Sequence, residues 1–194
     1  MRRPSRGFTL IELLVTLVVA AILVSIALPS FRDLMRRSRV SSASNTLTGN
    51  LAYARTEAID RGQLVSMCPS TDGQTCAGGT TLETGWIVYT YPSGAASANK
   101  AATATSLILR ATANIAGVSV QSKNAEIITF GQQGQLKSTA MATSGPTLDF
   151  ITCYRSGSTG LGTSTATVPG AELKVNGSGS VATDVVATGT ACSP

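Results

Sequence analysis

Glu12 is a carboxylate inside an apolar segment of membrane-spanning length, and its chemistry is the least expected in the sequence. Residues 8–28 are otherwise almost uninterrupted apolar side chains, and they follow a short basic stretch that ends at Gly7. A helix needs about 20 apolar residues to cross a bilayer, so this segment is long enough. A charged carboxylate in the bilayer costs on the order of 2.5–3.5 kcal/mol on insertion scales. We therefore expect Glu12 to have a partner or a function there.

Four cysteines are the other residues with distinctive chemistry: Cys68, Cys76, Cys153 and Cys192. None belongs to a Cys-x-x-Cys pair, so their spacing does not indicate a zinc site. An even number of cysteines in an exported domain indicates disulfides, whereas a cytosolic domain would keep free thiols. Three pairings are open. We favour Cys68–Cys76, which closes a short loop, and Cys153–Cys192, which ties the C-terminal tail to a strand.

The composition excludes several classes of active site. The chain has no histidine, so Ser-His-Asp and Cys-His catalysis are ruled out and the commonest transition-metal ligand is missing. With no clustered carboxylates and no nucleophile motif after Gly62, we expect no enzyme activity, no metal site and no cofactor. The net charge of +5 comes from the N-terminal part, because residues 62–194 carry six basic and six acidic side chains. The basic balance therefore does not indicate a nucleic-acid-binding head.

The element that must position Glu12 is one long helix, expected over residues 8–61. Pro29 is expected to kink this helix rather than end it. Asp33 precedes Arg37 by four positions, the better orientation for an ion pair on a helix. In the second half, apolar and small side chains recur at steps of three and four, which predicts that this face packs on a folded domain. They are Val40, Ser44, Leu47, Leu51, Ala54 and Ala58.

After residue 62 the pattern changes to short β-rich runs separated by turn residues. Such spacing is typical of antiparallel sheet, and Asn176-Gly177 is a hairpin turn signal. The expected fold class is α+β, with one long N-terminal helix, spanning the membrane in its first half, packed on an antiparallel β-sheet head. The expected strands are residues 64–68, 86–91, 106–111, 118–121, 126–130, 148–154, 172–175 and 181–186.

The segment from Gly7 to Phe31 resembles the N-terminus of type IV prepilins and type II secretion pseudopilins. The resemblance implies that a prepilin peptidase cuts after Gly7, that the new N-terminal residue Phe8 is methylated, and that the helix stays on the mature protein. It also implies that Glu12 of one subunit pairs with the N-terminal amine of Phe8 of the next. The alternatives are a secretory signal peptide, a plain single-span anchor and a buried core helix.

The resemblance extends to about residue 154 and narrows to the GspH/FimT family of minor pilins and minor pseudopilins. The short loop between Cys68 and Cys76 favours the FimT-like minor pilins within that family. The implied division is a leader peptide over 1–7, a transmembrane helix and filament core over 8–31, an amphipathic second half of the helix over 32–61, and a β-rich periplasmic head over 62–194.

The function implied by the resemblance is that of a structural minor pilin that assembles into, or primes, a type IV pilus. Its partners would be other pilins or pseudopilins through the N-terminal helix, the prepilin peptidase and the bacterial inner membrane, with the head in the periplasm before assembly. The alternatives are a minor pseudopilin of type II secretion and a DNA-binding minor pilin. DNA binding is not favoured, because residues 175–181 lack the arginines of the family's DNA-binding motif. The candidate DNA contacts are Lys137, Arg155 and Lys174.

Overall fold

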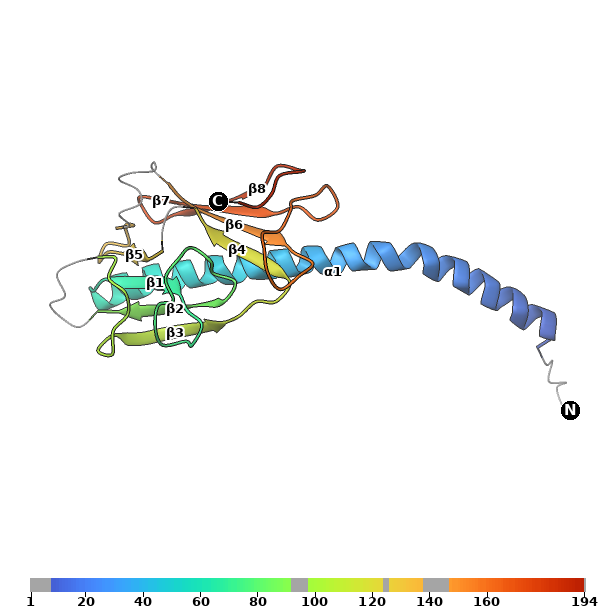
Figure 1. Cartoon of the computed structure of the whole chain (residues 1–194), viewed down its shortest axis with the longest axis horizontal. Helices are drawn as coiled ribbons and strands as arrows, with labels where there is room; N and C mark the ends of the chain where they lie inside the picture. Colours follow the sequence, from blue (N-terminus) through green and yellow to red (C-terminus); the bar gives the residue numbers. More distant parts are fainter. Residues whose placement is uncertain (1–7, 92–97, 124–125, 138–146, 194) are drawn as a thin grey trace, which may run out of the picture.

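The chain forms one long helix and a β-rich head built around the C-terminal half of that helix (Figure 1). The computed structural model describes residues 8–91, 98–123, 126–137 and 147–193. The N-terminal half of the helix projects from the head as a stalk (Figure 1). The expected α+β fold class is confirmed.

Helix α1 runs from Leu10 to Arg61 and continues through Pro29. It begins two residues later than expected because Thr9 caps it. The backbone of Thr9 is extended, and its hydroxyl accepts a hydrogen bond from the Glu12 N–H at 3.3 Å. The helix ends at Gly62, whose left-handed φ of 58° suits a glycine C-cap. In Figure 1 the stalk bends away from the line of the head half.

The expected pair between Asp33 and Arg37 was wrong. Asp33 instead pairs with Arg36, one position closer, at 3.0 Å. The Arg37 Nε donates to the carbonyl oxygen of Thr167, which lies 130 residues further along the chain. A contact with the head therefore takes Arg37 away from its neighbour on the helix.

The strands form two antiparallel sheets, and all eight predicted strands are present to within two residues. Local sequence patterns do not specify how these strands pair. The first sheet has the order β3-β2-β1-β5 and the second the order β4-β6-β7-β8. The first contains β1 (Val65–Pro69), β2 (Gly85–Thr90), β3 (Leu107–Ala113) and β5 (Ile128–Phe130). The second contains β4 (Val118–Ser122), β6 (Thr147–Tyr154), β7 (Ala171–Asn176) and β8 (Val181–Val185).

The predicted apolar face of α1 lies in the main core, where it contacts strands of both sheets. Leu47 and Leu51 are completely buried there, together with Trp86 of β2 and Phe150 of β6. A second, smaller cluster on the first sheet contains Cys68, Ile87, Tyr89 and Tyr91. Every residue of β1 and β2 is buried as a result. Because both faces of these strands are covered, they show no alternation of buried and exposed residues.

Candidate functional site

Phe8 and Glu12 lie at the exposed end of the stalk. The side chain of Phe8 is 82% exposed, and Glu12 stands in the first turn of α1, where a carboxylate complements the positive end of the helix dipole. Gly7, the expected cleavage position, lies outside the described residues. The expected partner of Glu12 belongs to another subunit, so the pairing of Glu12 with Phe8 stays a prediction.

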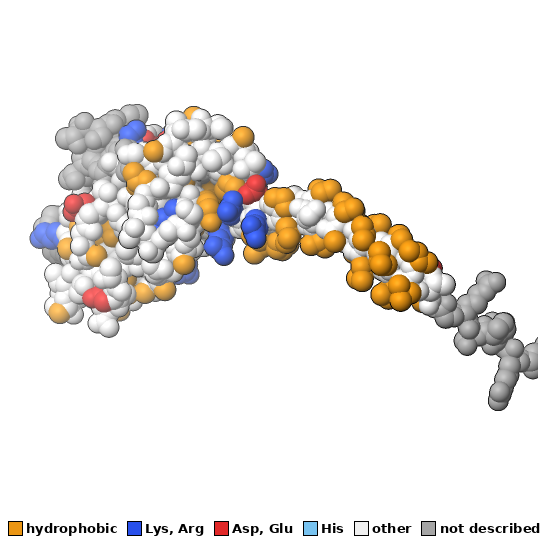
Figure 2. All heavy atoms as spheres, turned by 45° about the vertical axis from the view of Figure 1, so that its right-hand side comes forward, with side chains coloured by type: hydrophobic (Ala, Val, Ile, Leu, Met, Phe, Trp, Pro, Cys, Tyr) orange, Lys and Arg blue, Asp and Glu red, His pale blue; other side chains and the backbone are white. Residues whose placement is uncertain are grey.

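The surface of the stalk is apolar and unpacked within this chain (Figure 2). By length and composition α1 can cross a membrane, and none of its most apolar segment is buried. A core helix of a soluble domain would be buried, so that alternative does not fit. A signal sequence passes the same test of length and composition.

Two disulfides join Cys68 to Cys76 and Cys153 to Cys192, the two pairs that we favoured from the sequence. The first closes an eight-residue separation in the loop that follows β1. The second spans 39 residues and holds the C-terminal tail against the end of β6. Both link strands to segments without regular structure, so they restrain the parts of the head that the sheets do not hold.

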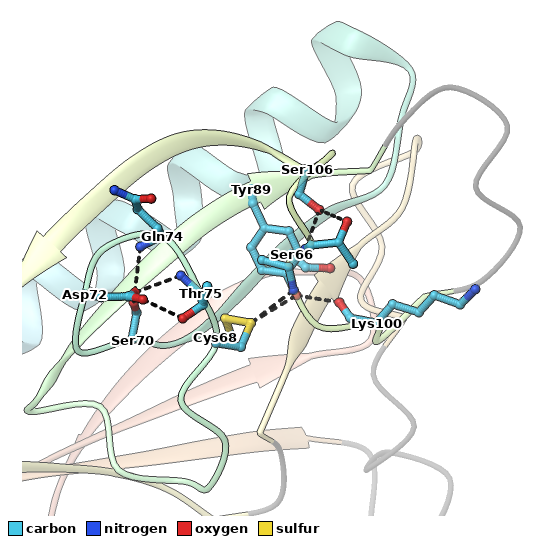
Figure 3. The surroundings of a disulfide bond; sticks show 12 residues. Ser66, Cys68, Ser70, Asp72, Gln74, Thr75, Tyr89, Lys100 and Ser106 are labelled. Carbon is cyan, nitrogen blue, oxygen red and sulfur yellow. Dashed lines mark hydrogen bonds between the residues drawn. A yellow bond between two sulfur atoms is a disulfide. The ribbon is translucent and has the colours of Figure 1, made fainter.

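The loop closed by Cys68–Cys76 is organised around the carboxylate of Asp72 (Figure 3). This carboxylate accepts the hydroxyl of Thr75 at 2.6 Å and the backbone N–H groups of Thr75 and Gln74, each at 2.8 Å. The hydroxyl of Ser70 donates to it at 3.0 Å. These hydrogen bonds, that of the Thr75 hydroxyl above all, stabilise the ionised form and hold the pKa of Asp72 well below its usual range.

We expect an Asp72→Asn variant to lose less stability on acidification than the wild-type chain. Because the pKa of Asp72 is depressed in the folded state, its contribution is fully present above the unfolded pKa of about 3.9. The contribution is lost as the pH falls below that value toward the folded pKa. Denaturant unfolding of both proteins between about pH 7 and about pH 3 measures the difference. Asp60→Asn, which removes a carboxylate on α1, is the control. Parallel curves for wild type and Asp72→Asn would contradict the prediction.

Beside the same disulfide, Tyr89 and Tyr91 hold the backbone at Lys100 against the first sheet. Both phenolic hydroxyls donate to the Lys100 carbonyl oxygen at 2.6 Å, and the Lys100 N–H donates to the Tyr91 hydroxyl at 2.8 Å. The Ser66 hydroxyl lies 3.0 Å from that of Tyr91. Burial raises the pKa of Tyr89 far above its usual value, so this phenol stays neutral. The cluster has the character of a structural clamp.

The three candidate DNA contacts are not gathered into one basic surface. Lys174 on β7 is ion-paired with Glu172 at 3.1 Å and Asp184 at 2.9 Å, and the hydrogen bond that it donates to the Asp184 carboxylate is the main cause of its raised pKa. Lys174 lies opposite Asp149 near the start of β6, whereas Arg155 follows the end of β6, a distance of about 20 Å along the strand. Lys137 is exposed and follows β5 in the chain.

The hairpin between β7 and β8, where the family's DNA-binding motif would lie, is held by the side chain of Asn176. Its Oδ1 accepts the backbone N–H groups of Ser178 and Ser180, at 3.1 and 3.0 Å. The predicted Asn-Gly turn is confirmed. The turn of the hairpin, residues 175–181, contains no basic residue.

Sequence reasoning missed a buried ion pair that joins the segment before β2 to the segment after β6. The Arg155 Nη1 lies 2.9 Å from the Glu83 Oε1, and the two side chains are only 9% and 5% exposed. The carboxylate of Glu83 also accepts the Val120 N–H and the Gln121 side-chain N–H, each at 3.0 Å. No local pattern marks this pair, because 72 residues separate its members. Arg155, named above as a candidate DNA contact, is thus engaged inside the head.

The described residues bring no three His, Cys, Asp or Glu side chains together in an arrangement that could hold a metal ion. The candidate functional features are therefore an apolar stalk with one carboxylate near its tip and a head that is cross-linked by two disulfides. Both are features of assembly and stability rather than of catalysis.

Comparison with curated proteins finds matches to fimbrial proteins. The fimbrial protein EcpC of Eikenella corrodens is 36% identical over 62 residues, which are 32% of this chain and 40% of EcpC. A fimbrial protein of Pseudomonas aeruginosa is 30% identical over 72 residues, which are 37% of this chain and 47% of that protein. The chain therefore spans less than half the length of these curated relatives.

Among solved structures, the type IV minor pilin FimU of Pseudomonas aeruginosa matches with a TM-score of 0.51 and 20% identity. The match covers 81% of this chain and 96% of that one. At this level of identity the likeness shows a shared pilin fold.

Two family models match the chain. The prokaryotic N-terminal methylation motif covers residues 2–28, the stretch that holds Gly7, Phe8 and Glu12. The model described as type II transport protein GspH covers residues 43–179, well over half of the chain and most of the head. On this evidence the chain is a pilin-like protein and belongs to the GspH family.

Proposed function

We propose that this chain is a structural minor pilin that assembles into, or primes, a type IV pilus after a prepilin peptidase cuts behind Gly7. The observation that carries the proposal is the division of one continuous helix. Its first half is an exposed apolar stalk headed by the methylation motif, and its second half is the core of a compact head. A subunit built this way is anchored by the stalk in the inner membrane and contributes the same stalk to a filament.

The apolar character of the stalk supports its proposed movement from the membrane into a filament. In the bilayer a helix satisfies all its backbone hydrogen bonds internally. Moving into a filament replaces lipid by neighbouring helices, so the apolar burial changes little. Glu12 is then the group that distinguishes the two environments, because its charge finds a partner in the Phe8 amine of the adjacent subunit. The pairing offsets the cost of burying both charges and sets the register of one subunit against the next.

The first test is the intact mass and N-terminal sequence of the protein purified from membranes of its own host. The expected product begins at methylated Phe8 and, because of two disulfides, is lighter than the reduced chain by four hydrogens. Immunolabelling of sheared pili then tests whether the processed chain is a filament subunit.

Two results would overturn the proposal. A chain that begins near Leu28 would mean that the apolar segment is a removed signal peptide. A chain that still begins at Met1 and carries free thiols would mean that it is neither processed nor exported.

A minor pseudopilin of type II secretion is the second candidate, and the description of the matching family model favours it. Deletion of the gene discriminates the two: loss of piliation supports the pilus, and loss of secreted enzymes with normal pili supports the pseudopilus. DNA binding has less support, since the candidate contacts Lys174 and Arg155 lie at opposite ends of β6 and residues 175–181 carry no basic side chain. Salt-dependent binding of DNA by the processed chain tests it.

A further inference from the structure

An open groove of about 400 Å³ lies where the loop that follows β6 meets α1. Arg36 of α1 and Arg155 contribute two guanidinium groups to its wall, and the loop contributes a row of hydroxyl groups. None of the residues that line the groove is acidic. The hydroxyl-bearing residues include Ser156, Thr159, Thr163 and Thr165.

Arg155 is held rigidly and retains an unused donor. Its Nη1 donates to Glu83 at 2.9 Å and to the Gly160 carbonyl oxygen at 3.2 Å. Its Nε is buried and has no hydrogen-bond partner within the part of the chain that the structure describes. A buried donor without a partner is costly, so an acceptor that reached this Nε would stabilise the arrangement.

Arg36 supplies the second cation. Its guanidinium carbon lies 5.0 Å from the ring centroid of Tyr154, and its Nη1 donates to Asp33 at 3.0 Å. One cation–π contact and one ion pair fix the plane of the guanidinium and leave its other N–H groups for a ligand. Two oriented guanidinium groups with hydroxyl groups around them suit an oxyanion such as a phosphate ester.

The neighbouring cavity provides a contrast. It shares Arg155, Thr159 and Leu161 with the groove, but Glu83 lines its wall. The carboxylate of Glu83 repels an anion on that side. The groove beside Arg36 is therefore the one suited to a negatively charged ligand.

The groove also lies next to the point where the exposed apolar surface of the stalk ends. Exposed apolar side chains continue along α1 through Phe31 and Leu34 to Met35, the residue before Arg36. Arg32, Arg37 and Arg39 surround this point in the sequence, and basic side chains gather where the stalk meets the head (Figure 2). With the apolar surface in the bilayer, these cations lie at the level of the lipid phosphates.

We propose that the groove between Arg36 and Arg155 binds the phosphate group of an anionic lipid while the chain is anchored in the membrane. The lipid as source of the phosphate rests on the proposed membrane anchoring, whereas the phosphate chemistry rests on the groove alone. Binding would hold the head in a fixed orientation on the bilayer. Extraction of the subunit into a filament would leave this ligand behind.

Native mass spectrometry of the full chain in a neutral detergent, with phosphatidylglycerol titrated in, tests the proposal. Arg36→Gln removes one cation of the groove, and Arg32→Gln makes the same charge change one turn away, at a residue that does not line it. We expect one lipid per chain on the wild type, about tenfold weaker binding for Arg36→Gln, and unchanged binding for Arg32→Gln. Diacylglycerol with the same acyl chains and inorganic phosphate are the two comparison ligands.

Four outcomes would overturn the proposal. Equal losses in Arg36→Gln and Arg32→Gln would mean diffuse attraction to a basic surface. Equal binding of diacylglycerol would mean an apolar site. Displacement of the lipid by inorganic phosphate at similar concentration would overturn the lipid as the ligand and leave a site for free phosphate. Near-UV circular dichroism checks that Arg36→Gln is folded. If the chain is processed and its cells are piliated normally, but the purified chain binds no lipid, this inference is refuted and the proposed function stands.

Discussion

Pili from cells that express Glu12→Leu are expected to contain at least about a hundredfold less of this subunit than wild-type pili. If Glu12 pairs as proposed, the substitution leaves the Phe8 amine of the neighbouring subunit buried without its partner, and an unpaired member of a buried ion pair costs about 3–5 kcal/mol. Insertion into the membrane is expected to be unimpaired, because leucine is more favourable than a carboxylate in the bilayer. Immunoblots of sheared pili and of membranes measure the two pools separately.

Thr16→Leu is the matched control for this experiment. It also replaces a polar side chain on the stalk by leucine, one turn further along α1. The Thr16 hydroxyl donates to the carbonyl oxygen of Leu13 in its own helix at 2.8 Å, so it has no need of a partner in another subunit. We expect Thr16→Leu to assemble normally. Incorporation of Glu12→Leu at the wild-type level would show that the carboxylate has no role in assembly and serves only the first turn of α1.

The second large effect is expected inside the head, where Glu83→Gln should lower the free energy of unfolding by about 3–5 kcal/mol. The substitution leaves the guanidinium of Arg155 uncompensated in a site where its side chain is only 9% exposed. For a chain of this size the loss corresponds to a fall of roughly 6–20 °C in the unfolding midpoint. Thermal unfolding of the full chain in neutral detergent, followed by near-UV circular dichroism, measures it.

Two further variants identify the cause of that loss. The double variant Glu83→Gln with Arg155→Gln should be more stable than Glu83→Gln alone, since it no longer buries an unpaired charge. Asp184→Asn breaks an exposed pair with Lys174 and should change the stability little, because solvent screens the attraction between exposed charges. A cost for Glu83→Gln no larger than that for Asp184→Asn would contradict the view that the buried pair stabilises the head.

Features encoded by local patterns were predictable from the sequence. The positions of all eight strands follow from β-rich runs bounded by turn residues, and the buried face of α1 follows from its three- and four-residue spacing. Glu12 stood out because a carboxylate is rare in an apolar segment of this length. The start of α1 was misplaced by two residues, although Thr9 three positions before Glu12 is itself an N-cap signal.

Features that depend on distant residues were not predictable in the same way. A series of antiparallel strands is compatible with one sheet or with two. Because β1 and β2 are buried on both faces, they lack the alternation of apolar and polar residues that would show which face of each strand points to the core. The pairing of Glu83 with Arg155 and the contact of Arg37 with Thr167 join segments 72 and 130 residues apart. Neither pair leaves a mark in the residues around its members.

The unbroken course of α1 determines how this subunit responds to mechanical load. Across Leu10–Arg61, all of which the structure describes, the helix runs through Pro29 without a break. A pull on the stalk is therefore transmitted along the helix axis to Leu47 and Leu51, which are completely buried between the sheets. Extension would have to slide the helix past strands of both sheets, so that many packed contacts break together. The head is thus loaded in shear along the helix axis.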